Sequence, residues 1–230
     1  MSAKAEAGAL CPPKAIVFDW DNTLVDTWPN IIHTMNVTLA AMGQPTWSLA
    51  EARRRIARSL RDSFPELFGD RWKEARAVFY DELERSHIAM LTPLPGADAV
   101  LAGFAGAGIP MAVVSNKTGD YLRKEISHLG WGPRFAAVFG AGDLARDKPA
   151  PDAVFAFLDR VGLAPGQDIW FVGDSPVDVE TAHAAGCCAV FVSGGEKPAF
   201  PPERAPHATI GDCRDLANLV RHMDGPERKH

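Results

Sequence analysis

The fold is decided by the segment Ala15-Ile-Val-Phe-Asp-Trp-Asp-Asn-Thr-Leu-Val-Asp26, in which a short apolar run ends abruptly at Asp19. Asp19, Asp21 and Thr23 occupy alternate positions, and residues two apart point to the same side of an extended chain. The pattern predicts a strand that presents two carboxylates at its end, as a metal site or a nucleophile paired with a general acid/base requires. A solvated acidic turn is the alternative that this segment alone leaves open.

The composition is that of an ordinary globular protein. The chain has 230 residues, of which 47% are hydrophobic and 23% charged, and its formal net charge is -5. This mild acidity argues against a nucleic-acid partner, which would require a basic face. No apolar run reaches the length of a transmembrane helix, and the first ten residues have no apolar core typical of a signal peptide. The four cysteines form no Cys-x-x-Cys pair, so reduced thiols and a cytoplasmic location are expected.

Two kinds of region follow the first strand. Residues 28–92 contain helix signals and no convincing strand; Ser48-Leu-Ala-Glu51, for example, is a capping box. From residue 93 onward, apolar strands too short to be helices alternate with helical segments. This alternation predicts an α/β protein with a Rossmann-like parallel sheet covered by helices on both faces. The predicted core comprises residues 14–27 and 93–224, with an inserted all-helical domain over 28–92.

Ligands of such sheets bind beyond the carboxyl ends of the strands, and this rule can be tested on the sequence. Polar residues do follow the predicted strands. They are Asp19-x-Asp21, Ser115-Asn116-Lys117, Asp147-Lys148-Pro149 and Gly173-Asp174-Ser-Pro-Val-Asp178. We therefore expect several carboxylates, a hydroxyl and an isolated lysine to converge on one pocket.

The chemistry that fits this set is phosphoryl transfer with Mg²⁺. Carboxylates gathered in one place are costly to keep ionised unless a cation lies among them, and carboxylate oxygens suit Mg²⁺. Asp19 can attack phosphorus, while Asp21 protonates the leaving alcohol and later accepts a proton from water. Ser115 and the backbone N–H groups of Asn116 and Lys117, expected at the entry to a helix, suit the phosphate oxygens. Lys148 can neutralise the charge of the nucleophile and of the phosphoryl group.

These four motifs, in this order, resemble those of the haloacid dehalogenase superfamily, and the helical insert is similar to that family's cap domain. The resemblance covers roughly residues 14 to 220. It implies a Mg²⁺-dependent phosphohydrolase in which Asp19 is the nucleophile and a metal ligand. Asp21 would be the acid/base and would bind the metal through its backbone carbonyl, with Asp174 as the direct metal carboxylate. Asp178 would support the metal site from outside. Asn22 stands where many members have Gly, which we expect to alter a turn and not the chemistry.

Simpler interpretations stay open for several residues. Asp178 could be a first-turn residue favoured by the helix dipole. Thr23, taken as a support for the site, could only cap a turn. Lys117 resembles a lysine of phosphoglycolate phosphatases but could equally be exposed.

The substrate is expected to be a small phosphorylated metabolite chosen by the cap. Residues 57–69 resemble the loop between cap helices that faces the active site in phosphoglycolate phosphatases, so Arg58 and Arg61 are candidates for binding a second anion. Arginines on an amphipathic helix are also commonly a solvated face. The alternative functions are a phosphosugar mutase, a pyrophosphatase or a 5′-nucleotidase on the same fold, and a non-catalytic module that binds a phosphorylated metabolite. No pattern in the sequence predicts the oligomeric state.

Overall fold

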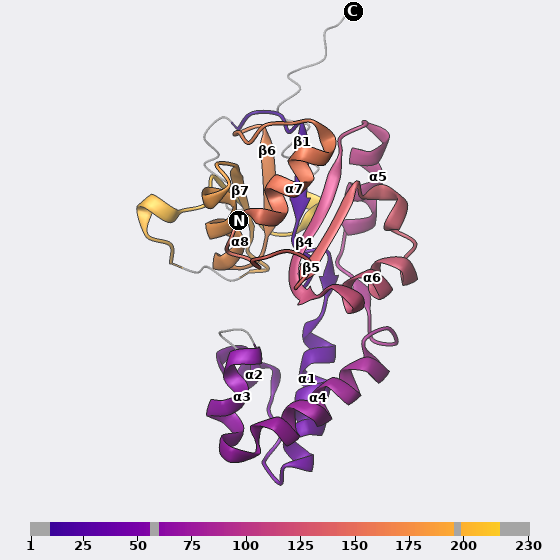
Figure 1. Ribbon diagram of the computed structural model, residues 1–230, viewed down its shortest axis with the longest axis vertical. Coiled ribbons are helices and arrows are strands. Elements are labelled where there is room, and N and C mark those ends of the chain that lie inside the picture. The colour runs from indigo at the N-terminus through magenta and orange to yellow at the C-terminus, as the bar shows by residue number, and fades with distance from the viewer. Residues whose placement is uncertain (1–9, 56–59, 196–198, 217–230) are drawn as a thin grey trace, which may run out of the picture. The chain divides into compact units, whose positions relative to one another are not determined.

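The computed structural model describes residues 10–55, 60–195 and 199–216 of the chain. A six-stranded parallel sheet, with strand order β5-β4-β1-β6-β7-β8, forms the centre of the larger unit (Figure 1). Its strands are β1 (Ala15–Phe18), β4 (Met111–Thr118), β5 (Ala137–Ala141), β6 (Ile169–Gly173), β7 (Cys188–Val192) and β8 (Ala208–Ile210). Since β1 pairs with β4 on one side and β6 on the other, the segment that opened the sequence analysis supplies a central strand.

Helices cover both faces of this sheet. They are α5 (Ala97–Gly106), α6 (Gly119–His128), α7 (Asp152–Val161) and α8 (Pro176–Ala184), with 3-10 turns η2 (Gly132–Arg134) and η3 (Pro202–Arg204). Neighbouring residues of β1 point to opposite faces. Val17 joins the apolar cluster that contains Phe157 of α7, whereas the Phe18 ring lies 6.5 Å from that of Phe104 in α5. The predicted Rossmann-like α/β fold is confirmed.

The chain divides into two compact units, of which residues 26–92 form the smaller. This unit contains α1 (Trp28–Ala41), α2 (Leu49–Arg55), α3 (Leu60–Phe68), η1 (Gly69–Arg71) and α4 (Trp72–Ser86). It has its own apolar core, in which the Phe64 ring lies 5.6 Å from Phe68 and 5.5 Å from Phe79. The chain passes between the units through β2 (Val25–Asp26) and β3 (Thr92–Pro93), which pair as a two-stranded sheet.

The capping box predicted before α2 is present. The Ser48 N–H donates to Glu51 Oε2 at 2.8 Å, and the Glu51 N–H donates to Ser48 Oγ at 3.3 Å. These reciprocal bonds satisfy two of the N–H groups that a helix start leaves without partners. The sequence therefore located this helix start correctly.

Three local predictions are wrong. Residues 60–68 of the presumed cap loop form α3, because Phe64 and Phe68 bury one helical face and outweigh the cost of Pro65 inside the helix. The sequence predicts a strand that ends at Ser115, but β4 continues to Thr118, where its pairing with β5 resumes. The strand-free interpretation of 28–92 fails at Thr92, which begins β3. The sequence also predicts a last helix over residues 215–222, most of which lies outside the described residues.

Candidate active site

Asp19 lies at the carboxyl end of β1, where its N–H still donates to the carbonyl of Val172 in β6 at 2.9 Å. Its Oδ1 atom accepts a hydrogen bond from Lys148 Nζ at 2.6 Å, and the same ammonium lies 2.6 Å from Asp178 Oδ1. The side chain of Lys148 is only 4% exposed. Residues from three separate strand ends thus meet in one buried ion-pair cluster, as the strand-end rule predicted.

Negative charge is not fully compensated in this cluster. Burial raises the pKa of the Asp19 carboxyl to about 7, although the Lys148 ammonium acts in the opposite direction. Burial, together with the charges of Asp19 and Asp178, also raises the pKa of Asp174 well above its usual value. Burial alone would lower the pKa of Lys148, but the carboxylates of Asp178 and Asp19 outweigh it, so this pKa is raised. Such a site favours the binding of a further cation.

Among the residues that the structure describes, Asp19, Asp174 and Asp178 form a group that could hold a metal ion, since their carboxylate oxygens lie within 4.8 Å of one another. Hard carboxylate oxygens of this kind suit Mg²⁺. Asp178 joins the group although the sequence placed it outside the ligand set. Its Oδ2 atom also accepts the Ser175 N–H at 3.0 Å, which caps α8. A Cβ atom on Gly173 would collide with the Asp178 carboxylate, so only glycine fits there.

The polar segment that follows the buried part of β4 differs from its prediction. The N–H of Lys117 donates to Ser115 Oγ at 3.1 Å. Because α6 begins only at Gly119, the N–H groups of Asn116 and Lys117 do not lie at a helix entry. The Asn116 side chain instead binds the backbone of Lys148, receiving its N–H and donating to its carbonyl at 3.1 Å each. Asn116 therefore fixes the loop that carries the Lys148 ammonium.

Lys117 is not the exposed lysine that the sequence allowed. Its side chain is 13% exposed, and its Nζ lies 2.7 Å from Asp21 Oδ1 and 2.6 Å from Glu125 Oε2. Burial would lower the pKa of Lys117, but the two carboxylates outweigh it and the pKa is raised. Sequence reasoning missed Glu125. A signal was present, since Glu125 occupies a position on the buried face of α6 beside Ile126.

The turn after Asp19 explains two further residues. Thr23 is fully buried, and its Oγ1 donates to Asp19 Oδ2 at 3.4 Å, so it contacts the site directly. Asn22 adopts a positive φ of 58°. Asparagine tolerates this left-handed conformation better than most residues, which explains how it can occupy a turn where the family resemblance leads us to expect glycine.

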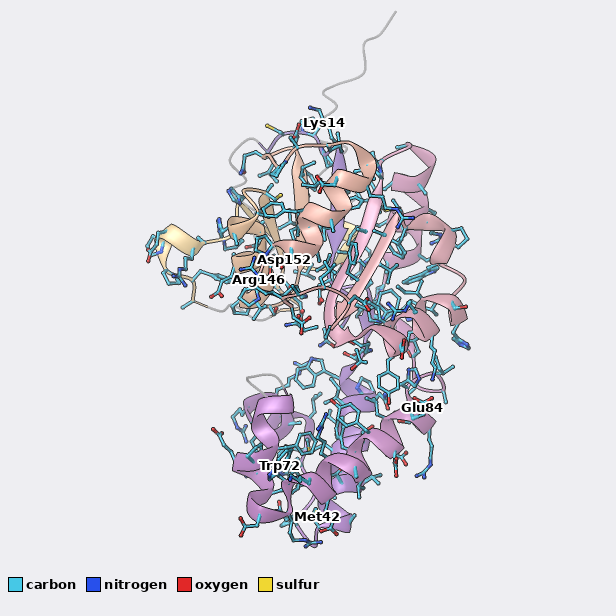
Figure 2. The ribbon with its side chains drawn as sticks, viewed as in Figure 1. Lys14, Met42, Trp72, Glu84, Arg146 and Asp152 are labelled. Atoms are coloured by element: carbon cyan, nitrogen blue, oxygen red, sulfur yellow. The ribbon has the colours of Figure 1, made fainter. Side chains whose placement is uncertain are left out.

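A shallow pocket, open in part to solvent, adjoins the site on the larger unit. Ser115 and Lys148 line it together with Phe139, Asp147 and Arg146. The Arg146 guanidinium lies 2.6 Å from the Asp152 carboxylate, and Figure 2 labels both residues. The pocket therefore gives solvent access beside Ser115 and Lys148.

The two cap arginines receive no structural account. Arg58 lies outside the described residues, and of Arg61 only the backbone, within α3, is described.

Comparison with known proteins decides the family. A family model described as haloacid dehalogenase-like hydrolase matches residues 16–192. The chain belongs to this family. The prediction of a hydrolase of the haloacid dehalogenase superfamily is thereby confirmed.

Two curated relatives match most of this chain. A protein from Xylella fastidiosa named phosphoglycolate phosphatase is 33% identical over 178 residues, which are 76% of this chain and 77% of that protein. A protein of the same name from Rhodospirillum rubrum is 32% identical over 230 residues, covering 94% of this chain and 92% of the relative. Both names describe phosphoric monoester hydrolases.

Solved structures agree with the haloacid dehalogenase-like fold. A hydrolase of this superfamily from Ehrlichia chaffeensis is 30% identical, has a TM-score of 0.66, and covers 93% of this chain and 98% of its own. A predicted phosphoglycolate phosphatase from Haemophilus somnus has a TM-score of 0.80 at 24% identity, covering 90% and 98% of the two chains, and supports the fold alone. None of the helices in the described part of the chain is long and apolar enough to cross a membrane.

Proposed function

We propose that this protein is a Mg²⁺-dependent phosphatase that hydrolyses small, phosphoglycolate-like phosphate monoesters through an aspartyl-phosphate intermediate. The observation that carries the proposal is the contact of the Lys148 ammonium with both Asp19 and Asp178, next to Asp174. This arrangement offers a nucleophile, a fixed positive charge and a set of metal-binding oxygens at one strand end.

In the first step, Asp19 attacks phosphorus. One of its carboxylate oxygens forms a bond to phosphorus while the bond from phosphorus to the ester oxygen breaks. Asp21, two residues on, gives its proton to the departing alcohol oxygen. Lys148 holds Asp19 Oδ1 at 2.6 Å, so the carboxylate is oriented before the substrate arrives.

In the second step, water attacks the phosphorus of the aspartyl-phosphate. Asp21, now ionised, accepts a proton from this water, and the bond between phosphorus and the Asp19 oxygen breaks. Inorganic phosphate leaves and the Asp19 carboxylate is restored. The Ser115 hydroxyl and the Lys148 ammonium would bind the phosphate oxygens in both steps.

Asp19, Asp174 and the backbone carbonyl of Asp21 would hold Mg²⁺, with Asp178 supporting the site through Lys148. When bound, the ion would neutralise charge on the phosphoryl oxygens and on the crowded carboxylates. The raised pKa values of Asp19 and Asp174 support this assignment, because burial and the neighbouring carboxylates disfavour their charged forms and Lys148 offsets this only in part.

The relatives named phosphoglycolate phosphatase favour a small anionic substrate, and Arg58 and Arg61 are our candidates for binding its carboxylate. A mutase, a pyrophosphatase and a 5′-nucleotidase would use the same first step with another acceptor or leaving group. A panel of phosphoglycolate, sugar phosphates, nucleotides and pyrophosphate at equal Mg²⁺ separates them. We expect phosphoglycolate to have the highest kcat/KM and phosphate release to accompany every turnover.

The decisive experiment measures phosphate release from p-nitrophenyl phosphate with and without Mg²⁺. We expect activity in the wild type with Mg²⁺, a large loss on chelation, and no activity in Asp19→Asn. Asp168→Asn removes an aspartate that pairs with Lys14 on the surface and should retain full activity. A folded wild-type protein that hydrolyses no phosphoester of the panel would show that the proposal is wrong.

A further inference from the structure

The Asp21 carboxylate is the end of a largely buried chain of hydrogen bonds. Lys117 Nζ donates to Asp21 Oδ1 at 2.7 Å and to Glu125 Oε2 at 2.6 Å. The indole N–H of Trp20 donates to the same Glu125 oxygen at 2.6 Å. Trp20 is fully buried and Glu125 is 1% exposed. One network thereby joins four residues, which come from the turn after β1, from strand β4 and from helix α6.

The network is rigidly supported. The Trp20 ring packs edge-on against Trp131 with the ring centroids 5.8 Å apart, and the Trp131 indole N–H donates to Asp98 Oδ1 at 3.0 Å. Glu125 lies on α6, whose buried face is otherwise apolar or small. A carboxylate so deeply buried is retained only where charged and polar partners compensate its lost hydration. Lys117 and Trp20 are those partners.

This geometry limits what Lys117 can do. A lysine ammonium has three N–H donors, and Lys117 directs two of them to Asp21 and Glu125. Its backbone N–H is also engaged, by Ser115 Oγ. Lys117 is thus committed to the Asp21 carboxylate, and the Asp21 atom that it holds is Oδ1. Proton transfer then falls to Oδ2.

We propose that Lys117, held in place by Glu125 and Trp20, is a positioning residue that orients the Asp21 carboxylate toward the leaving group and does not bind substrate phosphate. The inference rests on the proposed function, in which Asp21 donates a proton to the ester oxygen as the bond from phosphorus to that oxygen breaks. Glu125 draws the ammonium away from the phosphate and toward Asp21.

The inference predicts a dependence on the leaving group. An alkyl phosphate needs a proton from Asp21, because an alkoxide is a poor leaving group, whereas p-nitrophenolate leaves with little assistance. Losing an oriented general acid costs about 100- to 10,000-fold in rate. We therefore expect Lys117→Met to lower kcat/KM for phosphoglycolate at least about 100-fold, and that for p-nitrophenyl phosphate less than about 10-fold.

Matched variants distinguish a loss of Asp21 orientation from a failure of the protein to fold. Glu125→Gln retains the shape of the side chain and loosens Lys117, and Trp20→Phe retains a ring but removes the N–H donor. Both variants should raise the ratio of kcat/KM for p-nitrophenyl phosphate to kcat/KM for phosphoglycolate, as Lys117→Met does, but by a smaller factor. Should Lys117→Met fail to fold because Glu125 is left unpaired, the double variant Lys117→Met/Glu125→Gln removes both charges together. Lys124 is an exposed lysine of α6, the helix that carries Glu125, so Lys124→Met should leave the ratio unchanged.

The outcomes are distinct. A raised ratio of p-nitrophenyl phosphate to phosphoglycolate kcat/KM in the Lys117 and Glu125 variants, with an unchanged inhibition constant for inorganic phosphate, supports the inference. An unchanged ratio, with KM and the inhibition constant for phosphate both raised, would mean that Lys117 binds phosphate, and the inference would be wrong while the phosphatase proposal stood. A folded wild-type protein without phosphatase activity would overturn both.

Discussion

The Lys148 ammonium lies 2.6 Å from Asp19 Oδ1, although 129 positions separate the two residues in the chain. Lys148 also touches Asp178, so one cation balances two buried carboxylates. Removing it leaves both without their compensating charge. Lys148→Met should therefore lower kcat by at least about 100-fold. We also expect it to destabilise the protein by about 3 kcal/mol, since breaking a buried pair strands its partner.

Urea unfolding and Mg²⁺-dependent turnover measure these two effects. Lys14→Met is the control, because Lys14 pairs with Asp168 at 2.7 Å in an exposed position where screening is strong. It should change neither quantity. Equal behaviour of the two lysine variants would contradict the role assigned to the buried cluster.

The stability of the metal-free protein should depend on pH in a direction fixed by Asp19. Its pKa is raised to about 7 in the folded state, against an ordinary value of about 4. Folding therefore favours the protonated carboxyl, and the stabilisation that this provides is lost as the pH rises through 7. We expect the melting temperature without Mg²⁺ to fall by a few degrees between about pH 5 and pH 8, at about 1.4 kcal/mol per pKa unit. Added Mg²⁺ should reverse the loss at the higher pH.

Asp174→Asn provides the corresponding test by substitution. The pKa of Asp174 is raised by burial and by the neighbouring carboxylates, so its charge is costly without a metal. The variant should melt higher than wild type at about pH 8 without Mg²⁺ and gain little from adding it. Stabilisation of this variant by Mg²⁺ to the wild-type extent would argue against Asp174 as a ligand.

Asn116→Ala should reduce turnover with little change in fold. It removes the two hydrogen bonds that fix the Lys148 backbone, and losing about 1 to 2 kcal/mol of positioning corresponds to about a 10-fold fall in kcat. Asn36 offers a matched control, because its side chain binds both backbone groups of residue Trp47 in the smaller unit. Asn36→Ala should affect thermal stability more than kcat.

The backbone conformation of Asn22 predicts which of two substitutions at this turn gives the more stable protein. Its φ of 58° lies in the left-handed region, where a Cβ-bearing residue without a compensating side chain pays about 1 to 2 kcal/mol. Asn22→Ala should therefore be less stable than Asn22→Gly by about 1 kcal/mol in urea unfolding. An alanine variant as stable as the glycine variant would mean that this turn relaxes to another conformation.

The cap arginines provide a test of substrate choice. Arg58→Ala and Arg61→Ala should each raise KM for phosphoglycolate about 10-fold, as expected for one lost charge-assisted hydrogen bond. Neither should change KM for p-nitrophenyl phosphate, which has no carboxylate. Arg54→Ala removes an exposed arginine of α2 and should leave both values unchanged. Unchanged KM values in all three variants would leave these arginines as a solvated face.

The sequence by itself determined the fold class and the main members of the site. Apolar strands punctuated by glycine and alternating with helices imply a parallel sheet, and the carboxyl ends of such strands lie along one edge. For this reason Asp19, Asp174 and Lys148 could be placed together before their distances were known. Local signals such as the Ser48–Glu51 capping box were also sufficient, since they depend only on neighbours in the chain.

Tertiary structure alone decided which partner each charged group takes. Lys117 could have been exposed or bound to phosphate, and only the packing of α6 brings Glu125 within 2.6 Å of it. The same holds for Asp178, which joins the metal-binding group because α8 turns its carboxylate toward Lys148. Residues 60–68 form a helix because Phe64 and Phe68 pack into the core of the smaller unit. Contacts between distant residues depend on packing, and no pattern within a short stretch of sequence encodes them.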